Sequence, residues 1–253
     1  GECVSDLYPF LGNMAVTVHL NLMEGKSLCD PGQVPLLINA QGHLDCGFGS
    51  LLIRSFLPGR EKLRQQLKQE LRAQILAVRK VLPGEVPMRL DGHAHYHMIP
   101  VVFDAMMDVI REENLPVSYI RIPREYLRIY LPHLKNLQEF SPINIVKVMI
   151  LNFLSLRAEI RYGKILKNLE KKLFMGVFLS GRMYYENVIH LLPGALALAE
   201  KLGMGLEILA HPGGVFEQED IAQITSPEDV DEEEPEEEMI TVDFDALEKI
   251  NPD

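Results

Sequence analysis

Short apolar strands alternate with amphipathic helices along most of this chain, and that alternation constrains the fold more than any other feature. Residues 14–22 alternate apolar with polar side chains, as a strand does when one of its faces is buried. Residues 60–82 carry apolar side chains at helical spacing, and Pro83 and Gly84 end that helix. Strands joined by helices are typical of a parallel sheet. The sequence therefore predicts an α/β fold, either a barrel or a doubly wound sheet.

The remaining expected elements continue in the same order. We expect strands at residues 88–93, 117–122, 173–179 and 205–210, and helices at 101–113, 143–169 and 183–202. The segment 143–169 is expected to be helical in one or two pieces. Pro193 and Gly194 predict a break within 183–202, because proline removes an amide donor and glycine weakens a helix.

Three histidines follow a carboxylate at alternate positions in the run Asp91-Gly-His-Ala-His-Tyr-His97. If this run is an extended strand, the carboxylate and all three imidazoles share one face. Histidine is a neutral metal ligand and also exchanges protons near neutral pH. The run therefore predicts a metal site or an acid–base site, and a solvated polar strand or structural core histidines are the alternative.

Histidines also mark the ends of separate strands. His19, His93 and His211 each lie at the C-terminal end of an expected strand. In a β/α barrel these strand ends meet on one face, and the active sites of such barrels are built there. The agreement of three separate strands indicates a functional site at that face.

Negative charge is concentrated in one segment. The chain of 253 residues has a formal net charge of −11, but nine of its 36 acidic residues lie in 228–238, which has no basic residue. The remaining acidic residues nearly balance the 25 basic ones, so we expect no nucleic-acid partner. No apolar run is long enough to span a membrane. Cys3, Cys29 and Cys46 have no paired spacing, which indicates reduced thiols in a cytoplasmic protein.

Three motifs resemble the YdjC-like carbohydrate deacetylases. They are Val18-His-Leu-Asn-Leu-Met-Glu-Gly25, Leu90-Asp-Gly-His-Ala-His-Tyr-His-Met-Ile-Pro100 and Glu207-Ile-Leu-Ala-His-Pro-Gly213, in that order. Weaker support comes from Ile120-Arg-Ile-Pro-Arg-Glu125 and Leu179-Ser-Gly-Arg-Met183. The resemblance implies a TIM-like β/α barrel of the polysaccharide-deacetylase type and the metal-dependent removal of N-acetyl groups from amino sugars or chitooligosaccharides.

The resemblance also implies roles for particular residues. His19 and His93 would bind the metal, and His211 would protonate the departing amine. Asp91 would serve catalysis by orienting a ligand imidazole, which metal-bound histidines usually require. The family is usually credited with magnesium, whereas imidazole ligands suit zinc or another transition metal.

Five further residues are candidates for supporting the metal ligands or contacting substrate. The first three are His95, His97 and Asn21, and direct metal binding by the two histidines is the less favoured interpretation. Arg121 and Arg124 could hold a substrate hydroxyl or phosphate, and surface ion pairing is the alternative role for both.

One family motif has no counterpart upstream of the first histidine strand. The family normally begins with a strand that ends in Asp-Asp-Phe-Gly, which supplies the third metal ligand and the catalytic base. Here Asp6 is the only upstream aspartate. The first strand, the first helix and a second strand of the family fold are therefore expected to be missing. A truncated enzyme, a non-catalytic relative and replacement by a C-terminal strand carrying Asp243 and Asp245 are the competing explanations.

These observations predict a domain organisation and two leading functions. We expect a deacetylase-like barrel domain over 1–216, a flexible acidic segment over 217–238 and a strand or tail over 239–253. The first function is a metal-dependent deacetylase of N-acetylated amino sugars. The second is a family member that binds metal or sugar without turnover. A binuclear hydrolase site in the histidine run is a third, less favoured interpretation. Exposed edges of an incomplete sheet would favour a homodimer.

Overall fold

The computed structural model of the protein describes residues 15–84, 86–135, 137 and 141–210. The chain divides into two compact units, 1–209 and 210–253, and nearly all of the described residues belong to the first. Cys3, Asp6, His211, the acidic segment 217–238 and the segment 239–253 lie outside the described residues. Cys29 and Cys46 are both free thiols, as expected. Over the described ranges, no helix has the length and apolar character needed to cross a membrane.

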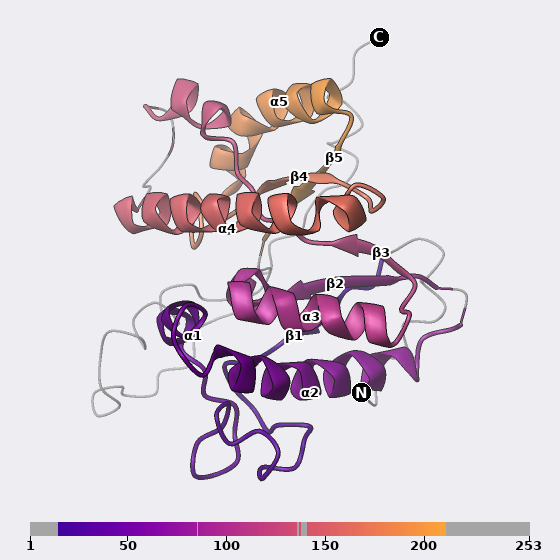
Figure 1. Ribbon diagram of the computed structural model, residues 1–253. Coiled ribbons are helices and arrows are strands. Elements are labelled where there is room, and N and C mark those ends of the chain that lie inside the picture. Colours follow the sequence, from indigo (N-terminus) through magenta and orange to yellow (C-terminus); the bar gives the residue numbers. More distant parts are fainter. Residues whose placement is uncertain (1–14, 85, 136, 138–140, 211–253) are drawn as a thin grey trace, which may run out of the picture. The chain divides into compact units, whose positions relative to one another are not determined.

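Two parallel sheets form the centre of the fold (Figure 1). The first contains β1 (Val18–Leu20), β2 (Met88–Gly92) and β3 (Val117–Ile120), and the second contains β4 (Lys172–Met175) and β5 (Gly205–Ile208). Backbone pairing aligns Val18 with Leu90 and Leu90 with Ile120. The predicted α/β fold with parallel strands is confirmed, and the strands of the described residues do not form a closed barrel.

Five α-helices connect or flank the strands of the described chain: α1 (Phe48–Arg54), α2 (Arg60–Arg79), α3 (Pro100–Glu112), α4 (Pro142–Leu166) and α5 (Tyr185–Leu202). Short 3-10 turns are η2 (His93–Met98), η3 (Leu127–Ile129) and η4 (Leu131–His133). Helix α1 was not predicted from the sequence. The expected break in α5 was wrong, because Pro193 lies inside one continuous helix. Burial of Leu191 and Ala195 on either side of it outweighs the loss of one amide donor.

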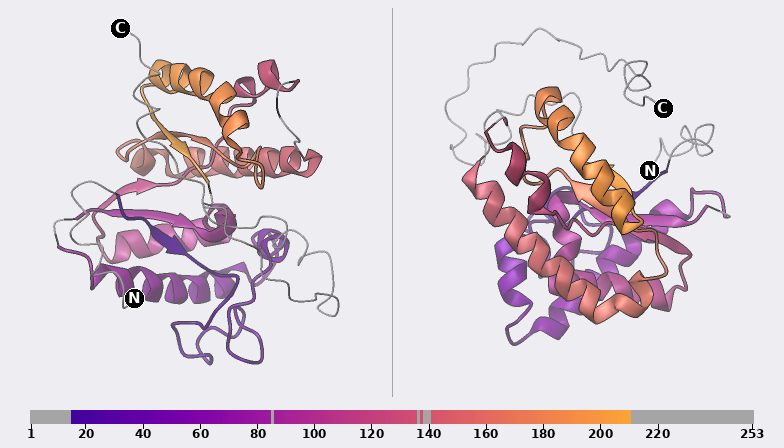
Figure 2. Two further views of the ribbon diagram at one scale, coloured as in Figure 1. Left: turned by 180° about the vertical axis from the view of Figure 1, so that it is seen from behind. Right: turned by 90° about the horizontal axis from the view of Figure 1, so that it is seen from above.

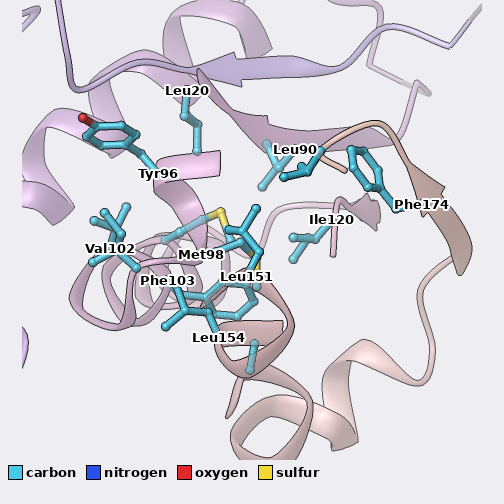
Figure 3. Close-up of a cluster of buried hydrophobic side chains, with 14 of the residues drawn as sticks. Leu20, Leu90, Tyr96, Met98, Val102, Phe103, Ile120, Leu151, Leu154 and Phe174 are labelled. Atoms are coloured by element: carbon cyan, nitrogen blue, oxygen red, sulfur yellow. The ribbon is translucent and has the colours of Figure 1, made fainter. Parts of the chain in front are cut away.

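The core lies between the first sheet and the helices α3 and α4. Figure 3 shows Leu20, Leu90 and Ile120 from the three strands beside side chains of both helices. Those helical side chains include Phe103 from α3 and Leu154 from α4. Because alternate strand residues point to opposite faces, burying the apolar face directs His19 and Asp91 to the other face.

Ion pairs at helical spacing join α2 to α3, which run side by side along the same face of the first sheet (Figures 1 and 2). The basic side chains lie four residues apart on α2, so they share one face of that helix. The pairs are Arg60–Asp104, Arg64–Asp108, Lys68–Glu112 at 3.0 Å and Arg72–Glu113 at 2.5 Å.

Asp104 is the most heavily engaged carboxylate of this ladder. Its side chain is fully buried on α3 and, besides Arg60, it contacts three groups of α4. Arg157 and Arg161 lie 3.4 and 3.2 Å from its oxygens, and the Tyr162 hydroxyl donates a hydrogen bond at 2.7 Å. One carboxylate therefore links α2, α3 and α4.

Replacing Asp104 with asparagine should destabilise the protein by about 3 kcal/mol, because it leaves several cations without their shared anion. Urea unfolding at neutral pH measures this change. Glu112→Gln, which removes a half-exposed pair between the same helices, is the matched control and should cost no more than about 0.5 kcal/mol. Equal effects of the two substitutions would contradict the central role of Asp104.

Candidate active site

His19 and Asp91 lie opposite one another on β1 and β2. The His19 Nδ1 and Asp91 Oδ1 atoms are 2.7 Å apart, and the side chains are 52% and 4% exposed. An ionised carboxylate only accepts hydrogen bonds, so Nδ1 carries the proton and donates it to Asp91. The Nε2 lone pair of His19 is thereby left available to a metal ion, in the arrangement that metal-binding histidines favour.

His93 begins the turn that follows β2 and lies next to His19. The two imidazole centroids are 5.6 Å apart and the rings are perpendicular. That separation is short enough for both rings to reach one ion. The structure thus brings together the two residues expected to bind metal, beside the carboxylate expected to orient one of them.

Asp91 is held from its other side by Arg121 of the segment after β3. The Arg121 guanidinium also binds Glu207 of β5, with Nη2 and Nε at 2.8 and 3.0 Å from Oε1. The Tyr119 hydroxyl donates to the second Glu207 oxygen. A continuous series of charged hydrogen bonds therefore runs from His19 through Asp91 and Arg121 to Glu207, across β1, β2, β3 and β5.

These contacts set the charge state of Asp91. Burial alone would raise the pKa of this carboxyl, but the hydrogen bond from His19 and the Arg121 charge hold the pKa below its ordinary value. Asp91 is therefore an anion at neutral pH. It can orient His19 and stabilise positive charge there, but both of its oxygens are already engaged.

The strand ends at Gly92, close to the expected end at residue 93, so the histidine run is not extended and the condition for three imidazoles on one face is not met. Ala94 and His95 have φ of 43° and 60°, in the left-handed region, and they turn the chain back beneath the end of β2. His97 then packs against Gly92, where a Cβ atom would lie 3.0 Å from the imidazole. The turn buries both imidazoles, with His95 8% and His97 1% exposed.

His95 and His97 are consequently held as neutral imidazoles. Burial lowers the pKa of His95 to about 3 and that of His97 to about 4. The His97 Nε2 atom lies 2.8 Å from the Arg121 carbonyl oxygen, to which it donates as the neutral tautomer. The His95 ring packs edge-on against Phe174. Burial thus favours the structural interpretation for this pair.

Asn21 and Arg124 occupy more peripheral places. The Asn21 side chain accepts a hydrogen bond from the Met23 amide at 2.9 Å and shapes the loop after β1. Arg124 pairs with Glu159 of α4 at 2.9 Å, and both side chains are partly exposed, as the ion-pairing alternative predicted. Arg121 is also ion-paired, but it is mostly buried rather than on the surface.

The sequence analysis did not single out Glu207 or Tyr119 as site residues. Glu207 is the one acidic residue of β5, and a carboxylate in a short apolar strand needs a buried cation or hydrogen-bond donors. Arg121 directly follows β3 and lies between Ile120 and Ile122, so it is the cation that such a carboxylate would need. Glu207 and Arg121 could have been proposed as partners because each is a lone charge in an apolar strand segment, although the order of the strands was unknown.

Glu125 is a second residue whose role was missed. Its buried carboxylate accepts hydrogen bonds from the amides of three successive residues after β4, with Gly176 at 2.6 Å, Phe178 at 3.0 Å and Val177 between them. Burial raises the pKa of Glu125 to about 7, and the amides act in the opposite direction. Glu125 therefore fixes the loop at the carboxyl end of β4.

The described residues place two possible nitrogen ligands for a metal side by side. His19 and His93 are suitable nitrogen ligands, but no cluster of three or more histidine, cysteine or acidic side chains within the described ranges could hold an ion. His211 lies outside those ranges, three residues beyond the end of β5 at Ile208. Two imidazoles with the Asp91 carboxylate behind one of them fit a divalent ion that takes its further ligands from elsewhere.

Comparison with protein families matches residues 4–249 to the family described as YdjC-like protein. The chain belongs to the YdjC-like family. The resemblance read from the three sequence motifs is thereby confirmed. Within this YdjC-like chain, the first two motifs supply His19, Asp91 and His93, and the third contributes Glu207.

Curated relatives share part of their length with this YdjC-like chain. A carbohydrate deacetylase of Xenopus laevis is 32% identical over 114 residues, which are 45% of this chain and 35% of the relative. Carbohydrate deacetylases of Danio rerio and Mus musculus are 27% and 28% identical over 45% and 43% of this chain, and over 34% and 33% of their own lengths. The chain thus matches about a third of each. No solved structure matches the chain.

The raised pKa of Glu125 predicts a pH dependence of stability. An ordinary glutamate in the unfolded chain loses its proton near pH 4.5, whereas the folded protein retains it to about pH 7. Glu125 therefore contributes stability that is fully present below pH 4.5 and is lost as the pH rises to 7, by roughly 3 kcal/mol.

Urea unfolding of the wild type and Glu125→Gln at pH 5 and pH 8 tests this, since glutamine does not titrate. The lowered pKa values of His95 and His97 act in the opposite direction, but equally in both proteins, so the difference between them isolates Glu125. A difference that stays constant between the two pH values would contradict the prediction.

Proposed function

We propose that the protein is a metal-dependent carbohydrate deacetylase that removes N-acetyl groups from amino sugars. The observation that carries the proposal is the hydrogen bond between Asp91 and His19 beside the His93 imidazole. The hydrogen bond holds the His19 imidazole with its Nε2 atom directed away from the Asp91 carboxylate. The names of the matched relatives agree with the same activity.

A divalent ion bound by His19 and His93 would polarise the acetamide carbonyl and lower the pKa of a bound water. Two imidazole ligands favour zinc or another transition metal, although the family resemblance favours magnesium. The third ligand and the base that takes the water's proton would come from beyond the described residues. His211 is the proposed acid that protonates the departing amine.

Residues of the charged series would keep the site in its working geometry. Asp91 would hold the His19 tautomer that leaves Nε2 free, and Arg121 would keep Asp91 ionised by placing a positive charge against its second oxygen. Glu207 offsets the Arg121 charge, so the site does not carry an excess cation near the substrate. These three residues would position the ligands without touching the acetyl group.

The proposed fold is part of a TIM-like β/α barrel of the polysaccharide-deacetylase type. Support comes from the parallel strands in chain order and from two links between the sheets. The Glu170 amide donates to the Ser118 carbonyl at 2.9 Å, and Arg121 binds Glu207. The proposed substrate is a small N-acetylated amino sugar or chitooligosaccharide, bound at the carboxyl ends of the strands.

Metal content and acetate release test this proposal together. The purified full chain, supplied with zinc or magnesium, should bind about one divalent ion and release acetate from chitooligosaccharides, measured by elemental mass spectrometry and acetate assay. His19→Ala should abolish both. Asp91→Asn should weaken metal affinity by roughly 10- to 100-fold, because it removes the carboxylate behind a ligand imidazole.

His190→Ala is the matched control, because it removes an exposed histidine of α5 away from the charged series. It should leave metal content and acetate release unchanged. Metal or sugar binding without acetate release would instead favour the non-catalytic alternative. Metal content that is unaffected by His19→Ala would overturn the assignment of the site.

A further inference from the structure

Helix α4 is apolar on two opposite faces. One face is buried in the core, with Val148, Leu151 and Leu154 among its side chains. The other face is exposed but carries seven large apolar side chains between 37% and 77% exposed, here called the α4 stripe: Ile143, Val146, Met149, Ile150, Phe153, Leu156 and Ile160. A helix that is apolar all round is normally covered on all sides, and none of the described residues covers the α4 stripe.

The spacing of the α4 stripe matches a helix–helix interface. Ile143, Val146, Ile150 and Phe153 follow the alternating three- and four-residue steps of a heptad seam, and Ile160 lies one heptad after Phe153, with Arg157 at the position between them. Met149 and Leu156 widen the seam on one side. The stripe extends over about 26 Å of helix, since each residue adds about 1.5 Å. It is therefore a continuous surface rather than a set of isolated exposed residues.

The area of the α4 stripe is that of a subunit interface. At their observed exposures, the seven side chains present on the order of 800 Å² of accessible surface, against the roughly 800 Å² per partner of a standard interface. The largest apolar patch on a typical monomer is only about 300–600 Å². We propose that the α4 stripe is the contact surface of a homodimer, in which α4 packs antiparallel against the same helix of a second copy, centred on Phe153.

Antiparallel packing about Phe153 is self-complementary. Each residue then faces the one at the same sequence distance on the other side of Phe153. Val146 faces the partner's Ile160, Ile150 faces the partner's Leu156, and the two copies of Phe153 meet on the symmetry axis. Val146, Ile150, Phe153, Leu156 and Ile160 therefore each have an apolar counterpart, whereas Met149 lies opposite the partner's Arg157.

The polar residues beside the stripe fit the same arrangement. Lys147 faces the partner's Glu159, which already binds Arg124 of its own chain, so the added charge pair is a minor contribution that avoids like-charge repulsion. Arg157 and Arg161 add little repulsion, because both are already bound to the buried carboxylate of Asp104. A shallow hollow lined by Phe153, Leu156, Arg157, Ile160 and Arg161 lies opposite the partner's Met149, whose flexible side chain can fill it.

Sedimentation equilibrium of the full chain and of Phe153→Glu tests the proposal. The wild type should be a dimer at micromolar concentrations, and Phe153→Glu should be a monomer with unchanged helix content by circular dichroism. Phe56→Glu is the matched control, because Phe56 is 66% exposed against 63% for Phe153 but lies after α1. Phe56→Glu should remain a dimer.

A cysteine substitution tests the geometry without adding charge. Phe153→Cys on the symmetry axis should be joined to its counterpart by a short bismaleimide cross-linker, whereas Phe56→Cys and the wild type should show little product. A monomeric wild type, or a dimer that persists in Phe153→Glu, would overturn the proposal. A monomeric wild type that co-sediments with lipid vesicles, or with another protein through the α4 stripe, would also overturn it.

Discussion

Arg121 holds the two parallel sheets together at the candidate site. Its guanidinium contacts Asp91 of β2 and Glu207 of β5, and its backbone amide donates to Leu90 at 3.0 Å. Without this cation, two largely buried carboxylates would be left without a counter-charge, which is among the most destabilising changes a protein interior can undergo. The orientation of His19 depends on Asp91, so the geometry of the candidate metal ligands depends on the contact between the sheets.

Most helices and strands, and the grouping of His19, Asp91 and His93, could be predicted from the sequence because both depend on local periodicity. Apolar alternation in residues 14–22 gives the buried and exposed faces of β1, so it also gives the direction of His19. Parallel strands bring their carboxyl ends to one edge, and His19, Asp91 and His93 meet there. The ion-pairing alternative for Arg124 followed from its charge alone and agrees with its contact to Glu159.

The remaining features depend on contacts between residues distant in sequence. The turn at Ala94 and His95 uses left-handed backbone, which non-glycine residues seldom adopt and which the spacing of the run does not indicate. Glu207 and Arg121 are 86 residues apart, so their pairing follows only from the strand order. Pro193 was misjudged for a similar reason, since its local cost is outweighed by packing on either side of it.

The ion pairs between α2 and α3 have a consequence for behaviour on heating. The cost of removing charged groups from water falls as temperature rises, whereas hydrophobic stabilisation reaches a plateau. The four ion pairs of α2, three with α3 and one with Glu113 directly after it, therefore become more favourable relative to the apolar core on warming. The α2–α3 layer should be among the last parts of the molecule to open, and the amide protons of α3 should remain protected when others have begun to exchange.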